Sequence, residues 1–453
     1  MPNWAAVIMA AGKGTRMKSK LPKVMHCVAG KPMIEHVLDL AAENNVEQSF
    51  VILGHGREKI EEFLAGRAKI VLQTEQLGTG HAIMQAIPYL EGIDNIVVLS
   101  GDQPLIRPET LAKLIRLHTD FQGAATVLTA RFENPFGYGR IIKENNNLVK
   151  IVEEKDATPE ERTIQEINTG TYCFNVPKLK EALKQITPQN AQGEYYLTGV
   201  FDLFLAQGDK ITTYCTEDAN EALGINSRVQ LAEAEHVIRE RILNYWMDEG
   251  VTILDPASTF IGSEVQLSRD VVLEPYTILK GKTRIAEDVI LGPQTTLENC
   301  VCEAGCEVTH TVAKDAVIGP QCIVGPFAYL RPGTVLASKV KVGDFVEIKN
   351  SQIGEGSKVP HLSYVGDSQV GKSVNIGAGT ITCNYDGVKK YKTLIGDNVF
   401  IGSNTNLVAP VEIGEGAITG AGSTITKNVP AHALAVERST QKMKENWVRN
   451  NNK

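Results

Sequence analysis

The sequence predicts two folded parts, an α/β domain with a mostly parallel sheet followed by a stacked parallel β-helix. Three observations lead to this fold class. Short apolar runs alternate with helical patterns over residues 5–225, and an aliphatic residue recurs at every sixth position from Ile261 onward. The chain of 453 residues also exceeds the size of one usual hydrophobic core. We therefore expect two or three domains.

The first part alternates strands and helices. The apolar runs AAVIMA, SFVIL, KIVLQ and NIVVLSGD read as strands, and helical patterns cover Pro32 to Glu43, Arg57 to Leu64 and His81 to Pro88. Strands separated by helices of this length are typical of βαβ units. Apolar residues at helical spacing between Ser227 and Glu249 predict one long linking helix. The expected division is 1–226 for the α/β domain, 227–250 for the helix and 251–453 for the β-helix and tail.

The second part carries the six-residue period. Its aliphatic members are Ile261, Leu267, Leu273, Leu279, Ile285, Leu291 and Leu297, and later Ile318, Val324, Leu330, Leu336, Val342, Ile348, Ile395, Ile401, Leu407 and Ile413. β-Branched residues precede them at Val265, Val271, Thr277, Thr283, Val289, Thr295 and Val301. Such a period fits neither a helix nor a single strand, so each flat face of a solenoid contributes one inward side chain per repeat. Glycine often follows the inward residue, which suggests a corner with unusual φ.

Two breaks in the period are expected to leave the solenoid as loops, because an insertion in a stacked coil has no room inside it. They are Glu303 to Ala316, and Thr382 to Thr393 with the sequence TCNYDGVKKYKT. Cys300, Cys302 and Cys306 lie beside the first break. They lack a paired CxxC spacing, so packing inside the coil is favoured over a metal site.

Composition excludes several classes of protein. The net charge is −7 and the pI is about 5.8, which argues against a general binder of nucleic acid or of membrane surfaces. No apolar run approaches the roughly 20 residues of a membrane span. Eight cysteines in so long a chain are too few for a disulfide framework. We expect a cytoplasmic protein with free thiols.

A glycine-rich turn follows the first strand. It reads Ala10-Ala11-Gly12-Lys13-Gly14-Thr15-Arg16-Met17, and Lys23 follows shortly after. Backbone N–H groups of such a turn can approach phosphates, and Arg16 and Lys23 add positive charge. By itself the turn is a weak signal, about as well explained by a plain tight turn. Asp102, in LSGDQPL, lies at the carboxyl end of a later strand, where α/β folds bind ligands and where an acid can hold Mg²⁺ against phosphate oxygens.

Eight motifs in order, AAGKGTRM, LPK, EQLGTGHA, LSGDQPL, NPFGYGR, VEEKDA, EINTG and QGEYYLTG, resemble sugar-phosphate nucleotidyltransferases, and more narrowly bacterial N-acetylglucosamine-1-phosphate uridyltransferases. The resemblance implies a Rossmann-like nucleotidyltransferase domain that transfers the uridylyl group of UTP to a sugar phosphate and releases pyrophosphate. It places the nucleotide on Met9, Ala10, Ala11, Gly12, Gln73, Gly78 and Thr79 and its phosphates on Arg16 and Lys23. It places the sugar on Gly139, Glu153 and Asn168, and Mg²⁺ on Asp102 and Asn226, with Ser100 and Gly101 beside them. Ser100 departs from the family pattern, in which an aromatic residue commonly precedes Gly-Asp.

The hexapeptide period resembles left-handed β-helix acyltransferases. The segment KVGDFVEIKNSQIGEGSKVPHLSYVGDSQVGKSVNIGAGTITCNYDG is similar to glucosamine-1-phosphate N-acetyltransferases, and the two families occur fused in one bacterial enzyme. Histidine suits the task of accepting a proton from an attacking amine, so His361 is the candidate base. The resemblance implies that the sugar phosphate binds Arg331, Lys349, Tyr364 and Asn375. It implies that acetyl-CoA binds Ala378, Asn384, Tyr385, Ser403, Ala421 and Arg438, and that the protein is a homotrimer.

The leading hypothesis is a bifunctional enzyme of UDP-N-acetylglucosamine synthesis, which feeds cell-wall precursors. A single-function nucleotidyltransferase with a regulatory solenoid is one alternative, and it predicts no release of CoA. A scaffold without turnover is another. It is disfavoured because Gly14, Arg16, Lys23 and Asp102 are all present.

Overall fold

The computed structural model describes residues 2–12, 14–54 and 57–448. It contains two compact units, Met1–Ile238 and Arg239–Lys453, whose boundary lies within α7 (Arg228–Asp248). The expected linking helix is therefore present, while the predicted domain limits stay a prediction. No helix among the described residues is long and apolar enough to cross a membrane.

The first unit is built on a nine-stranded sheet with the order β11-β7-β10-β6-β1-β4-β5, to which β8 and β9 add at β10. The strands of this unit are β1 Trp4–Met9, β2 Cys27–Val28, β3 Lys31–Pro32, β4 Gln48–Leu53, β5 Lys69–Leu72, β6 Asn95–Ser100, β7 Ala125–Arg131, β8 Gly139–Glu144, β9 Asn147–Val152, β10 Glu166–Asn175 and β11 Ile211–Cys215. Its helices are α1 Met33–Glu43, α2 Glu58–Leu64, α3 Thr79–Ala86, α4 Pro108–Phe121, α5 Val176–Leu183 and α6 Gly199–Ala206, with short 3₁₀ turns η1 Thr15–Met17, η2 Lys23–Met25, η3 Ile87–Tyr89, η4 Glu161–Thr163 and η5 Ala219–Ala222.

The expected α/β class is confirmed, but the sheet is mixed. Strands β1, β4, β5 and β6 run parallel, as predicted, whereas β10 is antiparallel to β6, β7 and β8. Apolar side chains of α3, α5 and α6 pack on one face of the sheet, and those of α1, α2 and α4 on the other. The sheet is therefore buried on both faces, which explains why its strands read as continuous apolar runs.

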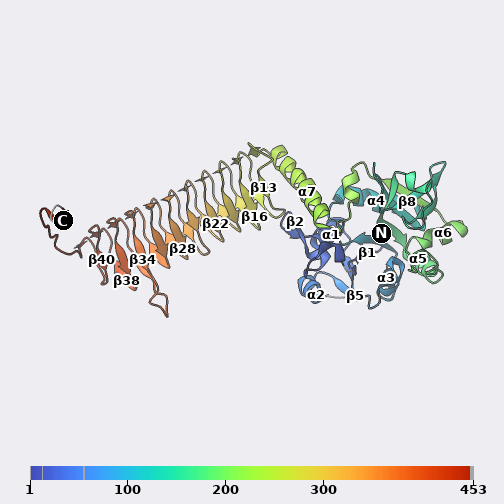
Figure 1. Ribbon diagram of the computed structural model, residues 1–453, viewed down its shortest axis with the longest axis horizontal. Helices are drawn as coiled ribbons and strands as arrows, with labels where there is room; N and C mark the ends of the chain where they lie inside the picture. Colours follow the sequence, from blue (N-terminus) through green and yellow to red (C-terminus); the bar gives the residue numbers. More distant parts are fainter. Residues whose placement is uncertain (1, 13, 55–56, 449–453) are drawn as a thin grey trace. The chain divides into compact units, whose positions relative to one another are not determined.

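The second unit is a β-helix of parallel strands, stacked coil upon coil in Figure 1. The first face holds β12 Thr252–Ile253, β15 Val272–Leu273, β18 Ile290–Leu291, β21 Glu307–Val308, β24 Ile323–Val324, β27 Lys341–Asp344, β30 Lys358–His361, β33 Asn375–Ile376, β36 Phe400–Ile401, β39 Ile418–Thr419 and β41 Leu434–Ala435. The second face holds β13 Phe260–Ile261, β16 Ile278–Lys280, β19 Thr296–Glu298, β22 Val312–Lys314, β25 Tyr329–Leu330, β28 Glu347–Lys349, β31 Tyr364–Gly366, β34 Ile381–Cys383, β37 Asn406–Val408 and β40 Thr424–Ile425. The third face holds β14 Gln266–Leu267, β17 Arg284–Ile285, β20 Val301–Cys302, β23 Val317–Ile318, β26 Val335–Leu336, β29 Gln352–Ile353, β32 Ser368–Val370, β35 Thr393–Ile395 and β38 Val411–Ile413.

The inward side chains of the β-helix form one continuous core. The predicted aliphatic positions are nearly all buried, with Leu330 and Ile348 at 0% exposure. Burying a leucine or isoleucine in this way stabilises the fold by about 1.5–3 kcal/mol per side chain. The β-branched position expected at Val301 is shifted by one residue, because Val301 is only half-buried and Cys300 is buried in its place. The three cysteines of this region pack in the core, as expected, and no metal-binding cluster of acidic, histidine and cysteine side chains occurs in the described ranges.

Only one of the two breaks in the period is a loop. Over Glu303 to Ala316 the chain stays in the coil as β21 and β22, and the phase shifts because some corners are one residue shorter, so that Leu297 pairs with Ala313 sixteen positions later. The expectation of a loop there was wrong. Between β34 and β35, by contrast, residues 384–392 leave the coil, and Tyr385 bridges Lys390 across this excursion.

Only some of the glycines after inward residues have the predicted cause. Gly292 and Gly325 do have positive φ values of 118° and 103°. At Gly343, however, a Cβ would lie 1.9 Å from the carbonyl oxygen of Pro360 on the next coil. The close approach of neighbouring coils therefore excludes a side chain there, without any unusual φ.

Candidate active sites

The first candidate site lies where β1 and β6 end side by side. Met9 is paired with Ser100 in the parallel register, and the Gly101 N–H donates to the Met9 carbonyl oxygen (3.0 Å). A Cβ on Gly101 would lie 3.2 Å from Val24 Cγ1 and 3.4 Å from Ala10 Cβ. The sequence Ser-Gly-Asp thus brings Asp102 tightly against the glycine-rich turn.

Lys23 joins the two predicted metal ligands. Its Nζ donates to Asp102 Oδ2 and to Asn226 Oδ1, the latter at 2.9 Å. Asn226 reaches this place because the backbone N–H of Ile225 donates to the Asp102 carbonyl oxygen (3.0 Å). The Lys23 and Asp102 side chains are only 13% and 17% exposed. The structure therefore brings together three residues that are far apart in the sequence, around one positive charge.

The glycine-rich turn leaves an open side. Nothing lies within 4 Å of the place that a Cβ on Gly12 would take, whereas Gly14 has φ 59° and a Cβ there would lie 2.8 Å from Lys23 Cβ. Arg16 is exposed on η1 and has no ion-pair partner among the residues that the structure describes. Lys13, quoted in the motif, lies outside the described residues.

A cavity of about 170 Å³ lies beside this turn. It is lined by Ala10, Gly12, Ser19, Lys20, Leu21, Pro22, Lys23, Val24, Gly54, Arg57 and Ile60. Lys20 and Arg57 add positive charge that the sequence analysis did not single out. A cationic environment of this kind suits an anionic group such as a phosphate.

A second cavity of about 220 Å³ gathers the predicted sugar-binding residues. Its lining includes Met9, Thr79, Ser100, Tyr138, Gly139, Glu153, Asn168, Gly170, Tyr172, Leu197 and Thr198. Gly139 lies opposite Asn168 in the pairing of β8 with β10, and an irregularity in β10 follows Asn168. The Asn168 amide donates to the Tyr172 hydroxyl (2.7 Å), which holds the amide against the cavity wall.

Glu153 forms one wall of this cavity. The Thr198 hydroxyl donates to Glu153 Oε1 (2.9 Å), and Glu153 Oε2 lies 3.4 Å from the place of a Cβ on Gly139. Burial raises the pKa of Glu153 above its ordinary value, and the hydrogen bond from Thr198 partly opposes that rise. The site therefore holds a carboxylate that is costly to ionise.

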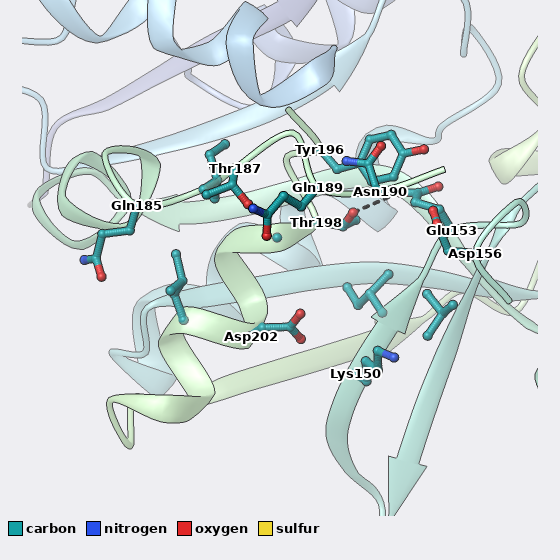
Figure 2. Close-up of a pocket in the computed structure, with 15 residues that line it drawn as sticks. Lys150, Glu153, Asp156, Gln185, Thr187, Gln189, Asn190, Tyr196, Thr198 and Asp202 are labelled. Carbon is teal, nitrogen blue, oxygen red and sulfur yellow. Dashed lines mark hydrogen bonds between the residues drawn. The ribbon is translucent and has the colours of Figure 1, made fainter. Parts of the chain in front are cut away.

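A more spacious cavity, about 420 Å³, lies on the other side of the same pair. Figure 2 shows the Glu153–Thr198 hydrogen bond at its edge, with Asp202 projecting from α6. Of the predicted site residues this cavity is lined by Glu153 alone, whereas the cavity of about 220 Å³ is lined by Met9, Thr79, Ser100, Gly139, Glu153 and Asn168, so volume alone does not identify the reaction site. We place the chemistry in the smaller cavity, where the predicted groups converge.

A buried ion pair shapes the roof of the smaller cavity. Arg140, 1% exposed, pairs with Glu154 Oε2 (2.8 Å) and donates to the Tyr138 carbonyl oxygen. The same Glu154 oxygen accepts from the Gly137 N–H (3.2 Å). A buried ion pair is costly unless other hydrogen bonds accompany it. Here the hydrogen bonds to the Tyr138 carbonyl oxygen and from the Gly137 N–H accompany the pair, and they hold residues 137–139 in one conformation.

Three of the predicted nucleotide residues, Gln73, Gly78 and Thr79, lie on a neighbouring loop. Gln73 is buried directly after β5, Gly78 has φ 110°, and a Cβ on Gly78 would lie 2.6 Å from the Tyr195 carbonyl oxygen. Thr79 begins α3, and its hydroxyl oxygen accepts from the Leu197 N–H (3.0 Å). This loop is therefore tied to the segment that carries Thr198.

The second candidate site centres on His361. Its Nδ1 lies 2.6 Å from Asp344 Oδ1, and the two residues are paired between β30 and β27. Hydrogen bonding to His361 holds the pKa of Asp344 below its ordinary value. The sequence analysis missed Asp344. The signal was present, because Asp344 follows the inward Val342 by two positions as His361 follows Val359.

Three cationic side chains lie near one another on the second face. Arg331 pairs with Glu347 (2.7 Å), and this hydrogen bond raises the pKa of Arg331. Lys349 pairs with Asp367 (3.3 Å), and this carboxylate raises the pKa of Lys349. The Lys349 ammonium in turn lowers the pKa of Lys390, which projects from the 384–392 excursion. Lys390 is a further residue that sequence reasoning missed, because the sequence of a loop does not show where its side chains point.

Asp367 organises the residues around Lys349. Burial alone would raise the pKa of Asp367, but hydrogen bonds from Asn350, Asn384 and Lys349 outweigh it and lower that pKa. The carboxylate therefore stays ionised beneath the cationic group. Asn384 is predicted to contact acetyl-CoA. In this structure its side-chain amide donates a hydrogen bond to Asp367.

The two other predicted sugar residues lie on different faces. Tyr364 is on β31, and a Cβ on Gly366 would lie 2.4 Å from the Tyr364 hydroxyl oxygen, so glycine is required beneath the ring. Asn375 is on β33, the face that also carries β30 and His361. Tyr364 is joined to this neighbourhood through the corner that follows His361.

The predicted acetyl-CoA residues form a row down one corner. His361, Ala378, Ser403 and Ala421 each follow an inward residue of the first face by two positions, namely Val359, Ile376, Ile401 and Thr419. Arg438 reaches the end of this row, where its Nη1 donates to the Ala421 carbonyl oxygen (3.3 Å). Tyr385 is exposed on the excursion, and its hydroxyl donates to the Gly387 carbonyl oxygen (2.6 Å). Small residues therefore line one strip that starts at His361.

Comparison with known proteins agrees with both halves. The nucleotidyl transferase family matches residues 5–252, and the bacterial transferase hexapeptide family, which has six repeats, matches residues 392–427. Three curated proteins, all called "Bifunctional protein GlmU", are similar over nearly the whole chain. The protein of Desulfitobacterium hafniense (strain DSM 10664 / DCB-2) is 72% identical over 100% of both chains. The chain belongs to the bifunctional GlmU family.

The other two relatives come from Heliobacterium modesticaldum and Carboxydothermus hydrogenoformans. They are 54% and 53% identical over 98% of this chain, and the matches cover 97% and 99% of the relatives. The predicted family and the two-part fold with a hexapeptide β-helix are thus confirmed. The single-function and scaffold alternatives lose their support, because the likeness to bifunctional proteins extends over both units.

Proposed function

We propose that the chain catalyses two successive reactions of UDP-N-acetylglucosamine synthesis. Glucosamine-1-phosphate is acetylated by acetyl-CoA in the β-helix, and N-acetylglucosamine-1-phosphate then reacts with UTP in the α/β unit. The single observation that carries this proposal is the full-length identity of 72% to a bifunctional GlmU protein. The convergence of polar residues at two separate places supports it.

In the uridyl transfer, a phosphate oxygen of the sugar attacks the α-phosphorus of UTP and pyrophosphate leaves. Such a reaction needs positioning and charge neutralisation more than a side-chain nucleophile. The turn at residues 10–12 and the loop of Gln73, Gly78 and Thr79 would hold the nucleotide. Lys23 and the exposed Arg16 would neutralise the phosphates. Glu153 and Asn168 would hold the sugar in the cavity beside Gly139.

The residues around Lys23 fit a magnesium ion. Asp102 Oδ2 and Asn226 Oδ1 both accept hydrogen bonds from one ammonium, so this pair of oxygens already accommodates a positive charge. Carboxylate and amide oxygens are ligands that Mg²⁺ takes, usually together with phosphate oxygens. When bound, the ion would offset the charge of the triphosphate. Lys23 would then be free to turn from Asp102 toward the phosphates.

In the acetyl transfer, the amine of glucosamine-1-phosphate attacks the thioester carbon of acetyl-CoA. The C–N bond forms, the C–S bond breaks, and the amine loses a proton. His361 Nε2 would accept that proton, because Nδ1 is engaged with Asp344. Arg331, Lys349 and Lys390 would bind the phosphate, with Tyr364 and Asn375 beside the sugar. The thiolate of CoA would leave along the strip of Ala378, Ser403 and Ala421.

We also propose self-association as a homotrimer through an exposed apolar ladder. Phe327, Phe345 and Leu362 are 53%, 60% and 62% exposed at one corner of successive coils. All three have positive φ values, which are rare for bulky residues, and the two phenylalanine rings stack with centroids 5.3 Å apart. Their exposure and the stacking of the two rings favour a surface that another copy covers. Because Leu362 follows His361, this surface would adjoin the acetyl transfer site.

Paired variants test the assignment of the two sites. His361→Ala should reduce CoA release by about 10²-fold or more and leave pyrophosphate release unchanged. Asp102→Ala should do the reverse, because it removes a carboxylate from the Lys23 cluster. Each variant serves as the folding control of the other. Equal loss of both activities in either variant would contradict the proposal, and light scattering of the wild type would test the trimer. The cytoplasmic location stays a prediction.

A further inference from the structure

Glu347 lies between two tyrosines on the outer surface of the second face. The parallel register pairs it with Tyr329 on the preceding coil and with Tyr364 on the following coil. Its sequence neighbours Val346 and Ile348 are buried in the core, so the Glu347 side chain points outward, where it is 39% exposed. Adjacent coils are about 4.8 Å apart. A carboxylate therefore stands directly beside Tyr364, one of the residues proposed to contact the sugar.

Glu347 also lies between the two ends of the site proposed for acetyl transfer. Three positions before it, Asp344 contacts the His361 ring at one corner of the coil. Two positions after it, Lys349 belongs to the cations that are proposed to bind the phosphate. A sugar whose amine meets His361 and whose phosphate meets Lys349 must therefore cross the part of the second face that carries Glu347.

The carboxylates around this site differ in which oxygens are already engaged. Asp367 is only 7% exposed, and both of its oxygens accept hydrogen bonds. Asp344 contacts Nδ1 of His361, whereas the amine is proposed to meet Nε2 on the other edge of the ring. Glu347 Oε1 accepts from Arg331 Nη1 (2.7 Å), and no donor within the described ranges contacts its Oε2. That oxygen of Glu347 is therefore open to a ligand.

The sugar that is acetylated carries a charge that this oxygen can recognise. Its amine resembles an α-amino group, whose pKa is about 7.7–8.0, so most of it is an ammonium at neutral pH. We infer that Glu347 Oε2 accepts a hydrogen bond from this ammonium, and that Glu347 thereby makes the acetyl transfer site specific for amino sugar phosphates. This inference rests on the proposed acetyl transfer.

The same contact distinguishes the substrate from the product. A hydrogen bond between two charged groups is stronger than one between neutral groups, and acetylation replaces the ammonium by a neutral amide. Glu347 therefore holds the substrate more strongly than the product. It takes no part in the covalent step, because the ammonium loses one proton to water before the attack and the next proton goes to His361. The bond from Arg331 to Oε1 fixes the direction in which Oε2 points.

The test compares two ligands of one site. Free thiol released from acetyl-CoA reports the β-helix alone, and it gives the KM of glucosamine-1-phosphate and the inhibition constant of glucose-1-phosphate. Glucose-1-phosphate has the same phosphate and a hydroxyl in place of the amine. Glu347→Gln removes the charge and keeps an acceptor oxygen for Arg331. We expect the KM to rise about tenfold or more and the inhibition constant to stay within about threefold of the wild type.

Arg331→Met is the matched control, because loss of a phosphate-binding cation should raise both constants together. An equal rise of both constants in Glu347→Gln would overturn the inference, since Glu347 would then act on the phosphate through Arg331. An unchanged KM would overturn it as well. A wild type that releases no thiol would overturn the proposed acetyl transfer alone. Calorimetry of the wild type and Glu347→Gln with the same two sugar phosphates would then still decide the role of Glu347.

Discussion

The Thr198→Val substitution tests the wall of the sugar cavity. Valine keeps the shape of threonine and removes the hydroxyl that donates to Glu153 Oε1 at 2.9 Å. A hydrogen bond to a charged group contributes about 1.5–3 kcal/mol, and one pKa unit corresponds to about 1.4 kcal/mol. Burial already raises the pKa of Glu153, and the bond from Thr198 lowers it. We therefore expect the variant to raise that pKa further, because the carboxylate loses this stabilisation.

The sign of the pH dependence follows from the carboxylate form. Ionised Glu153 offers two acceptor oxygens to the sugar, and protonation removes part of that capacity. The KM for N-acetylglucosamine-1-phosphate should therefore rise as the pH falls through the pKa of Glu153 in the folded protein. In Thr198→Val this rise should begin at a higher pH than in the wild type.

Pyrophosphate release measured across a pH series gives both KM profiles. Glu153→Gln is the matched control, because an amide cannot titrate and its profile should be flat in this range. The KM for UTP should not follow the same curve, since Glu153 lies in the sugar cavity. A Thr198→Val profile that coincides with that of the wild type would refute the role of the hydrogen bond.

Three further changes probe the β-helix. Asp344→Asn should lower kcat/KM for acetyl transfer about tenfold without affecting pyrophosphate release, because His361 loses a charged partner for its Nδ1; unchanged kinetics would remove Asp344 from the mechanism. Lys390→Met should raise the KM for glucosamine-1-phosphate with little change in kcat, since it removes one of the cations near Lys349. A fall in kcat alone would instead indicate a role in the transition state. Leu330→Ala should reduce the free energy of unfolding by about 2–5 kcal/mol, because Leu330 is fully buried in the solenoid core. Urea unfolding monitors it, and a loss below about 1 kcal/mol would mean that neighbouring coils refill the space.

The fold of the second unit was largely predictable because its repeats place an aliphatic residue at every sixth position of the sequence. The spacing of residues such as Leu330, Leu336 and Val342 identified the inward positions directly. The same pattern misled us at Glu303 to Ala316, where shorter corners shift the phase without forming a loop. Periodicity reports which side chains point inward, and it does not distinguish a shortened corner from an insertion.

The α/β unit was predictable in class but less so in detail. Apolar runs and helix lengths identified α1, α2 and α3 to within two residues. The reversal of β10 was not predicted, because a strand buried on both faces has the same composition in either direction. That reversal bears on the proposed function, since the irregular part of β10 carries Asn168 into the cavity proposed to hold the sugar.

The candidate sites were predicted by resemblance, and the residues that support them needed the structure. Asp344 lies 17 positions before His361, and only the stacking of coils makes the two neighbours. Lys390 lies close to Lys349 only through the direction of its side chain, which no spacing in the sequence reveals. The topology of the fold sets long-range contacts of this kind. Sequence motifs can therefore indicate the reaction, but they do not show which other residues contact the motif residues.

The most direct test of two activities in one chain is a pair of parallel assays on the purified protein with Mg²⁺. One supplies N-acetylglucosamine-1-phosphate and UTP and follows pyrophosphate, and the other supplies glucosamine-1-phosphate and acetyl-CoA and follows free thiol. We predict release of both products by the same preparation. Pyrophosphate without thiol would contradict the account, because it would reduce the β-helix to a scaffold and His361 to a structural residue.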